Sequence, residues 1–422
     1  MARVFYTLIY ALLLPLFLLR LWWRGRLNPG YRRRIRERFG LLPHRPRANG
    51  LWIHAVSVGE TLAAAPLVKS FREHYPDVPV MVTTTTPTGS EQVQRLFGPS
   101  VFHMYLPYDL PPFWSWFLNS LKPGLLVIME TELWPNLLAA CEDKKIPVML
   151  ANARLSEKSA QGYERFAALT RPMLDQLTLV AVQNAQDGQR FLQLGLPEAR
   201  LEVTGSVKFD MQIPAGIHER GNELRSQWGR ERRVLALASG HAGEDELLLD
   251  LLPQLQQHCP DLLLLLIPRH PERFDAVTNA AHSRGLRVRR RSQGVADADT
   301  LVYVADCMGE MLLLLAAADL VLVGGSLIAR GGHNPIEPAA LGKATLTGPH
   351  YFNFAVIVER LQASGALAVV SDQPQTLAAQ LLHYLDDPQL RRQMGDSGQQ
   401  VVEDNRGAVK RLTEICAGYL KL

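Results

Sequence analysis

The chain has 422 residues, a formal charge of +4 and a globular composition, with 47% hydrophobic and 20% charged residues. This length exceeds what one hydrophobic core usually covers, so we expect two domains and an appendage. Between Arg20 and Arg47 there are ten Arg and one Glu, so this segment contributes +9 and the remainder carries −5, which argues against a general nucleic-acid-binding surface. The cysteines form no CxxC pair, which fits a reducing compartment and argues against a structural zinc site; they are Cys141, Cys259, Cys307 and Cys416.

The N-terminal segment predicts a membrane anchor. Residues 4–19 contain no charge and no glycine, and only Pro15 interrupts the apolar run. As a helix they cover about 24 Å, against a hydrocarbon core of roughly 30 Å. Arg20 can snorkel, and Trp22 and Trp23 suit the membrane interface, so the length becomes sufficient. No small-residue cleavage site follows, so we predict an anchor that is not removed as a signal peptide.

The segment that follows the anchor is strongly basic. Residues 31–40 read YRRRIRERFG and predict a basic helix that lies on anionic lipid, with about 1 kcal/mol of attraction for each basic residue near the surface. By the positive-inside bias this helix lies on the cytoplasmic face. The alternatives are a solvated basic helix or a buried N-terminal helix. We assign residues 1–47 to the anchor and this interfacial helix.

From residue 51 the chain alternates apolar runs with amphipathic helical patterns, which predicts parallel sheets covered by helices on both faces. Residues 211–233, with Pro214, three glycines and mixed charges, predict a linker. The predicted strands are 51–57, 78–86, 101–106, 125–129, 148–153, 178–183 and 201–204 before the linker, and 234–238, 262–267, 301–304, 320–323, 344–347 and 366–370 after it.

The predicted fold is therefore α/β, with two doubly wound, Rossmann-like domains at 48–210 and 234–422. The last helix of the second domain is a candidate to pack back on the first. Ligands of such sheets bind beyond the carboxyl ends of the strands. Two facing sheets would therefore place the active site in a cleft between them.

The stretch His54-Ala-Val-Ser-Val-Gly-Glu60 reads as a strand, a tight loop and the start of a helix. An acid at this position is held on a rigid element and faces whatever binds above the sheet, so Glu60 is our first candidate for a chemical role. The alternative is that Glu60 only complements the helix N-terminus, a contribution of roughly 0.3 to 1 kcal/mol.

Other polar residues follow predicted strands of the first half. Each is able to hydrogen-bond a polyhydroxylated or phosphorylated acceptor, and capping of a local helix or turn explains each equally well. They are Ser57 and Gly59 beside Glu60, Thr85, Glu130 with Glu132, Asn152 with Arg154, and Lys208 at the end of the last strand.

In the second half, the loop GGSLIARGGHNPIEP at 324–338 is the strongest ligand-site candidate. Its two glycine pairs permit close backbone approach, Asn334 can bind a phosphate or sugar, and Glu337 can accept from two ribose hydroxyls. Weaker candidates at the other strand ends have ordinary structural explanations, such as a helix start or a surface ion pair. They are Ser239, His241, Arg269, Met308, Gly309, Glu310 and Gly325.

No metal site is predicted, because the twelve histidines never fall at HxxH or HxxxH spacing and no carboxylate cluster resembles a metal box. The sequence also contains no GxSxG and no GxxxxGK[ST], which removes the commonest serine hydrolase and P-loop hypotheses.

Taken together, the motifs resemble the Kdo transferases of lipopolysaccharide assembly, and the resemblance runs almost end to end, the anchor included. Eight motifs in one order are far more specific than any one of them. They are HAVSVGE at 54–60, TTTTPTGS at 83–90, METELWPN at 129–136, NARLS at 152–156, GSVKFD at 205–210, PRHPERF at 268–274, MGE at 308–310 and GGHNPIEPAA at 331–340.

This resemblance implies a two-domain GT-B glycosyltransferase on the cytoplasmic side of the inner membrane. It implies an inverting transfer of 3-deoxy-D-manno-octulosonic acid (Kdo) from CMP-Kdo to a lipid A precursor, lipid IVA, without a metal or other cofactor. The partners would be these two substrates and the membrane surface, with no nucleic acid and no obligate protein partner.

The resemblance also assigns roles to residues. It makes Glu60 the general base, the first domain the acceptor-binding domain and the second the CMP-sugar-binding domain. The motifs match the family's donor site at Arg269, Met308, Gly309, Glu310, Asn334 and Glu337. We add Lys208, Ser239, His241 and Gly325 to the donor set, and Ser57, Gly59, Thr85, Glu130 and Arg154 as acceptor candidates.

Two other hypotheses remain open from the sequence. One is another GT-B enzyme that uses a UDP-sugar on a lipid acceptor. The other is a membrane-tethered nucleotide-binding module, which would leave Glu60 without a role.

Overall fold

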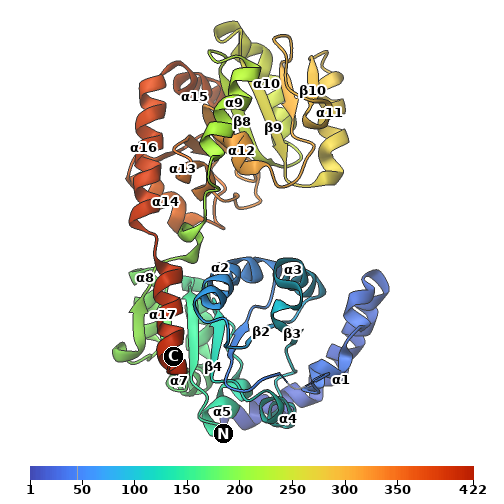
Figure 1. The fold of residues 1–422 in the computed structure, drawn as a ribbon, viewed down its shortest axis with the longest axis vertical. Helices are drawn as coiled ribbons and strands as arrows, with labels where there is room; N and C mark the ends of the chain where they lie inside the picture. The colour runs from blue at the N-terminus through green and yellow to red at the C-terminus, as the bar shows by residue number, and fades with distance from the viewer. Residues whose placement is uncertain (45) are drawn as a thin grey trace. The chain divides into compact units, whose positions relative to one another are not determined.

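The computed structural model describes residues 1–44 and 46–422, which form two compact units. Unit 1 comprises Met1–Met211 and Asn405–Leu422, and unit 2 comprises Gln212–Asp404 (Figure 1). Each unit is built on a seven-stranded sheet whose paired strands all run parallel, with helices on both faces. The predicted fold class, α/β with two doubly wound domains, is confirmed.

The sheet of unit 1 has the strand order β3-β2-β1-β4-β5-β6-β7. The chain winds outward in one direction from β1 and in the other from β4, so the topological switch point lies between these two strands, where ligands of such sheets bind. The strands are β1 (Leu51–His54), β2 (Val80–Thr84), β3 (Phe102–Tyr105), β4 (Leu125–Met129), β5 (Val148–Ala153), β6 (Leu179–Val182) and β7 (Leu201–Val203).

Side chains of unit 1 alternate between two apolar cores because successive residues of a strand point to opposite faces. In β1, Leu51 and Ile53 enter the core under α2, α3 and α17, whereas Trp52 enters the core under α4, α5, α7 and α8. The helices are α2 (Val58–His74), α3 (Pro87–Phe97), α4 (Pro111–Leu121), α5 (Pro135–Asp143), α6 (Glu157–Arg165), α7 (Ala167–Asp175), α8 (Ala185–Gln193) and α17 (Ala408–Leu420).

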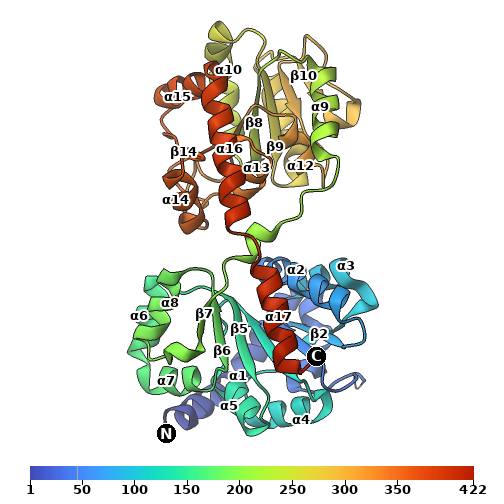
Figure 2. The same cartoon turned by 60° about the vertical axis from the view of Figure 1, so that its left-hand side comes forward.

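The C-terminal helix α17 belongs to unit 1 and lies beside α2 (Figure 2). The Asp210 carboxylate accepts hydrogen bonds from the backbone N–H of Gly407 at 2.5 Å and of Val409 at 2.6 Å, which caps the start of α17. The Arg411 guanidinium donates to the Thr204 carbonyl at 2.9 Å. Unit 2 therefore ends before this helix.

The sheet of unit 2 has the order β10-β11-β9-β8-β12-β13-β14, with its switch point between β8 and β12. The strands are β8 (Val234–Gly240), β9 (Leu263–Pro268), β10 (Val288–Arg290), β11 (Val302–Val304), β12 (Leu320–Val323), β13 (Ala344–Thr347) and β14 (Leu367–Val369). The helices are α9 (Ile217–Trp228), α10 (Glu244–His258), α11 (Phe274–His282), α12 (Met311–Ala316), α13 (Ile336–Ala340), α14 (Ala355–Ala363), α15 (Pro374–Asp386) and α16 (Pro388–Asp404).

The predicted linker at 211–233 is wrong for its central part, which is helix α9. Ile217, Leu224 and Trp228 lie on one face of α9 and are buried in the same core as the side chains of α12. Gly221 allows the two helices to approach, because a Cβ at this position would lie 2.6 Å from that of Ala316. The sequence of α9 is mostly polar outside its buried face, so it did not show a clear apolar helical pattern.

The predicted basic helix at 31–40 is also wrong. The structure has two 3₁₀ turns here, η1 (Pro29–Arg32) and η2 (Ile35–Phe39), separated by Arg34 at φ 57°. Arg38 is buried, donates to the Thr85 carbonyl at 3.0 Å, and stacks its guanidinium 4.2 Å from the ring centroid of Tyr105. These arginines therefore hold the segment to unit 1 rather than presenting a uniformly basic face.

Helix α1 (Ala2–Leu27) is long and apolar enough to cross a membrane, by length and composition alone. Near its start, the Thr7 hydroxyl donates to the Asn136 side chain at 3.0 Å, and the Tyr6 hydroxyl bonds the buried Asp109. Asp109 also accepts from the first backbone N–H groups of α5. The outward side chains of α1 are apolar and exposed; they include Val4, Phe5, Leu8, Leu12, Leu16 and Leu19.

Candidate active site

Glu60 lies in the first turn of α2, directly beyond β1. Ser57 is the N-cap of this helix. One Glu60 carboxylate oxygen accepts from the Val56 N–H at 2.8 Å and the other from the Ser57 hydroxyl at 3.1 Å. The Ser57 hydroxyl oxygen in turn accepts from the Glu60 backbone N–H at 3.4 Å, so Glu60 does contribute to the helix start.

Glu60 also lines a cavity of about 420 Å³ at the carboxyl ends of β1, β4 and β5. The position is the one expected for a ligand site in this sheet, because it lies at the switch point between β1 and β4. The other lining residues are Glu130, Thr131, Glu132, Arg154, Ser156 and Ser159. Of our predicted residues, the structure brings Glu60, Glu130, Glu132 and Arg154 together here.

The surroundings of Glu60 favour its protonated form. Burial, together with the negative charges of Glu130 and Glu132, raises the pKa of Glu60 to about 7, against the lowering effect of the hydrogen bonds from Val56 and Ser57. A carboxylate whose pKa lies near the working pH is suited to accept a proton during a reaction. Burial likewise raises the pKa of Glu132.

Opposite charges accompany these acids. The Arg154 guanidinium lies 3.0 Å from the Glu130 carboxylate, and the Thr131 hydroxyl donates to the Arg154 carbonyl. Lys208 lies in η5 (Val207–Asp210) of unit 1; burial lowers its pKa, the Glu130 charge raises it and Arg154 lowers it. The charged residues that line the cavity in the described chain are therefore three acids and one cation, and the cation is paired with Glu130.

Three predicted acceptor residues, Ser57, Gly59 and Thr85, are not among the described residues that line this cavity. They lie in or beside the loop after β1. Ser57 is bonded to Glu60, and the Thr85 hydroxyl donates to the Val56 carbonyl at 3.2 Å. Gly59 is exposed, and a Cβ there would contact only the Ser57 hydroxyl oxygen, at 3.9 Å.

In unit 2 the loops after β8 and β12 are joined by a buried acid, Glu244. Its carboxylate accepts from the backbone N–H of Gly325 at 2.7 Å, of Ser326 at 3.0 Å and of Leu327 at 3.0 Å. It also accepts from the His241 N–H at 3.1 Å. Glu244 thus fixes the loops at the switch point of this sheet, a role that we did not predict.

Two histidines stack beside this junction. The Nε2 atoms of His241 and His333 lie 2.7 Å apart, with the rings nearly parallel at 8°. Burial lowers the pKa of His333 to about 4, helped by the charges of His241 and Arg269. Burial also lowers the pKa of His241, so near neutral pH both rings are uncharged and share one hydrogen bond. Gly325, at φ 70°, leaves the space that the His333 ring occupies.

Asn334 and Glu337 lie at the start of α13, beyond the same loop. The Asn334 amide donates to Glu337 at 3.3 Å, and its oxygen accepts from the Ile336 N–H at 3.2 Å. Burial raises the pKa of Glu337, whereas the Asn334 bond and the Arg269 charge lower it. His241, Arg269, Gly325, Asn334 and Glu337 therefore gather at the carboxyl edge of the sheet.

The remaining predicted donor residues lie at the ends of β8 and β11. Ser239, with φ 62°, ends β8 in a left-handed conformation. Beyond β11, Met308 is 61% exposed and Gly309 has φ 87°. Glu310 is paired with Arg291 at 2.7 Å, which lowers its pKa. No group of three His, Cys, Asp or Glu side chains that could hold a metal ion occurs in residues 1–44 and 46–422.

Sequence reasoning missed Thr131, Ser156 and Ser159 of the Glu60 cavity. Ser156 is the N-cap of α6, and its hydroxyl accepts from the Ser159 N–H at 3.2 Å. The signal available in the sequence was a run of polar residues directly after β5. The same signal marks any helix start, so it could not identify a site.

Comparison with known proteins identifies the family. A family model described as 3-deoxy-D-manno-octulosonic-acid transferase (kdotransferase) matches residues 33–211. The 3-deoxy-D-manno-octulosonic acid transferase of Haemophilus influenzae is 39% identical over 424 residues, covering 100% of this chain and 99% of the relative. The transferase of the same name from Bordetella pertussis is 36% identical and covers 100% of both chains.

A solved structure supports the fold independently. The crystal structure of MurG from Acinetobacter baumannii matches with a TM-score of 0.57 at 15% identity, over 87% of this chain and 99% of that one. At this identity the match shows the fold alone, and it confirms the GT-B type. The full-length identity to two transferases, together with the ordered motifs, shows that this chain belongs to the 3-deoxy-D-manno-octulosonic acid transferase family.

Proposed function

We propose that this chain transfers Kdo from CMP-Kdo to a hydroxyl of the lipid A precursor lipid IVA, in lipopolysaccharide assembly. Membership of the Kdo transferase family makes it a glycosyltransferase. The observation that carries the mechanism is the position of Glu60, whose carboxylate lines a cavity of about 420 Å³ at the switch point of unit 1.

Glu60 is the general base in this proposal. The acceptor hydroxyl loses its proton to the Glu60 carboxylate as its oxygen attacks the anomeric carbon of Kdo. A positioned base of this kind contributes typically 10² to 10⁴ in rate. The bond to CMP breaks on the opposite face of the sugar, so the anomeric configuration is inverted.

The nucleotide binds in unit 2 at the carboxyl edge of its sheet. Arg269 supplies positive charge for the CMP phosphate, and His241 and Asn334 supply polar groups at the β8 and β12 loops. Glu337 accepts hydrogen bonds from the ribose hydroxyls. The phosphate charge is balanced by these side chains and by backbone N–H groups, and the reaction uses no metal and no other cofactor.

The chain works at the cytoplasmic face of the inner membrane. The exposed apolar side chains of α1 bind the bilayer, in which the acyl chains of the acceptor also lie. The acceptor's phosphorylated head group enters the Glu60 cavity, where Arg154 and Lys208 lie near Glu130.

The test uses purified full-length enzyme, CMP-Kdo and lipid IVA, with the product detected by mass spectrometry. Glu60→Gln should lower the transfer rate by about 10² to 10⁴ while the variant is still stabilised by CMP in a thermal shift assay. Glu91→Gln, an exposed acid away from the cavity, is the matched control and should transfer normally. Ordinary turnover by Glu60→Gln would remove Glu60 as the base, and absence of transfer by the natural chain would overturn the proposed reaction.

A further inference from the structure

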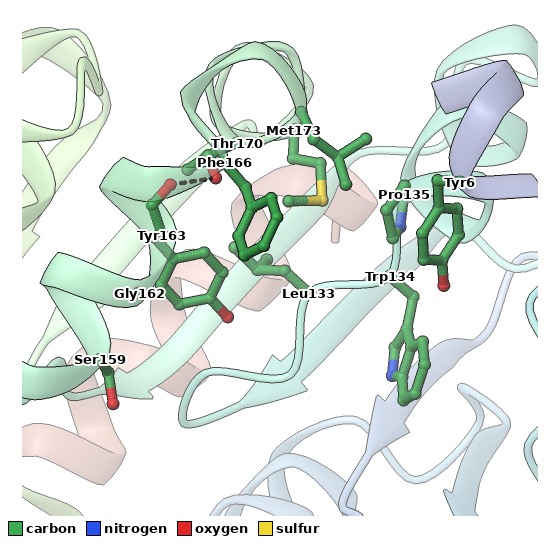
Figure 3. Close-up of a pocket in the computed structure, with 11 residues that line it drawn as sticks. Tyr6, Leu133, Trp134, Pro135, Ser159, Gly162, Tyr163, Phe166, Thr170 and Met173 are labelled. Atoms are coloured by element: carbon green, nitrogen blue, oxygen red, sulfur yellow. Dashed lines mark hydrogen bonds between the residues drawn. The ribbon is translucent and has the colours of Figure 1, made fainter. Parts of the chain in front are cut away.

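Unit 1 contains a second cavity, of about 460 Å³, directly beside the Glu60 cavity. Its walls come from α1, the loop before α5, and helices α6 and α7, and they are mainly apolar (Figure 3). Ser159 lines both cavities, so they are adjacent. The large apolar and aromatic side chains of the wall are Tyr6, Leu133, Trp134, Phe166, Leu169 and Met173.

The polar groups of this wall are engaged with the protein itself. The Tyr163 hydroxyl donates to the Thr131 carbonyl at 3.3 Å, and the Thr170 hydroxyl donates to the Tyr163 carbonyl at 2.8 Å (Figure 3). The Tyr6 hydroxyl bonds Asp109. Of the described residues that line this cavity, only Trp134 has a buried side-chain polar atom without a hydrogen-bond partner, its indole nitrogen, and that atom is not open to the cavity. The wall therefore offers mainly hydrocarbon, which does not suit a sugar or a phosphate.

The same cavity adjoins the membrane-binding surface of the chain. Tyr6 belongs to α1, whose neighbouring residues Val4, Phe5 and Leu8 are exposed and apolar. At the junction of α6 and α7, Phe166 is 70% exposed although its ring lines the cavity. A chain of methylene groups can therefore pass from the bilayer into the cavity along apolar side chains.

We propose that this cavity binds one acyl chain of the lipid acceptor while the acceptor's sugar head occupies the neighbouring Glu60 cavity. The inference rests on the proposed function and adds a specificity site to it, because the enzyme then recognises the lipid by an acyl chain as well as by its head group.

Gly162 of α6 provides a sharp test. It lines the cavity, and a Cβ at this position would meet nothing within 4 Å, so the side chain of Gly162→Leu begins in open space and should take up part of the cavity. Gly418 of α17 is equally open, lies outside the cavity and is the matched control. Both substitutions replace a helix-interior glycine with a good helix former.

The first measurement is KM for the acceptor. Since each excluded methylene lowers affinity roughly fourfold, Gly162→Leu should raise KM for lipid IVA by about tenfold, which corresponds to about 1.4 kcal/mol. With a fully deacylated acceptor, KM of Gly162→Leu should be nearly equal to KM of the natural chain. Gly418→Leu should change KM for neither acceptor. An unchanged KM for lipid IVA, or equal effects on both acceptors, would overturn the proposal.

The second measurement does not require transfer, so it separates this proposal from the proposed function. Lipid IVA that carries a photoreactive diazirine at the end of one acyl chain is bound to the full-length protein without CMP-Kdo and irradiated. Labelled peptides should map to residues 133–135 and 159–173, and Gly162→Leu should lose this labelling. Labelling confined to α1 would overturn the proposal. So would equal labelling of the cavity by phosphatidylglycerol that carries the same diazirine, if unlabelled lipid IVA does not compete with it.

Discussion

At the scale of single residues, Glu60 combines two roles that usually exclude each other. An acid in the first turn of a helix ordinarily has a low pKa, because backbone N–H groups and the helix dipole favour its charged form. Here burial and two neighbouring carboxylates outweigh those effects and raise the pKa of Glu60 to about 7. The two hydrogen bonds orient the carboxylate, and the raised pKa suits the role of general base that we propose for it.

The pH profile of transfer follows from this pKa. The base acts only when it is ionised, so kcat/KM should rise roughly tenfold per pH unit at acidic pH and level off above the pKa of Glu60. We expect kcat/KM to level off in a bend at about pH 7, because burial raises the pKa of Glu60 to about this value. Because the Glu132 charge contributes to the raised value, Glu132→Gln should move the bend to lower pH, whereas Glu91→Gln should not move it. A bend that Glu132→Gln leaves in place would contradict this assignment.

The sequence was sufficient to single out Glu60, because a glycine loop between an apolar strand and a helix has few conformations. The residues of the cavity wall were less accessible to prediction. Ser159 and Gly162 lie on α6 and look like ordinary polar and small residues of a surface helix. Their importance comes from the proximity of α6 to the end of β4, which no local pattern specifies.

At the scale of elements, apolar runs predicted the central strands well because strands buried on both faces, such as β4 and β9, are continuously apolar. The edge strand β10 was missed because Val288 is followed by Arg289 and Arg290, which are only partly buried. Charge alone also could not distinguish an α-helix from the 3₁₀ turns η1 and η2. That difference depends on contacts of Arg38 with Thr85 and Tyr105, which are distant in sequence.

Helix α9 gives a prediction at this scale. If α9 is a core helix, Gly221→Ala should destabilise the protein by about 1–3 kcal/mol, because the added Cβ would lie 2.6 Å from that of Ala316 in a packed interface. Gly162→Ala, where a Cβ meets nothing within 4 Å, should stabilise it by up to about 1 kcal/mol. Both values follow from thermal or urea unfolding of the full chain. Equal effects of the two substitutions would contradict the packing of α9 against α12.

At the scale of the whole molecule, the sequence and the structure differ in which segments they predict to contact a membrane. The sequence places both an apolar helix and a basic helix at the lipid surface. The structure leaves the apolar side chains of α1 exposed but turns Arg38 inward and pairs Arg34 with Glu37 at 2.7 Å. The hydrophobic contribution to membrane binding should therefore exceed the electrostatic one.

Flotation with lipid vesicles measures this balance. The natural chain should remain bound at about 1 M salt, where the Debye length is about 3 Å and charge attraction is screened. Replacing Phe5, Leu8, Leu12 and Leu16 together with Ser should release it, since burial of each such side chain contributes about 1.5–3 kcal/mol. Replacing the exposed Arg33 and Arg36 with Gln should weaken binding only to anionic vesicles at low salt. Release of the natural chain by salt alone would contradict this prediction.

The return of α17 to unit 1 has a consequence for biosynthesis. Helix α17 covers an apolar face of α2 and η5, and this face stays exposed until residues 405–422 have left the ribosome. Unit 2, by contrast, is complete once Asp404 has been synthesised. At 5–20 residues per second this delay after Met211 is roughly 10–40 s. The first unit to begin synthesis is thus the last to close, and during this interval α1 is already available to the membrane. Chains that are truncated at Asp404 and released from the ribosome should therefore bind chaperones through unit 1, while unit 2 is already protected from protease.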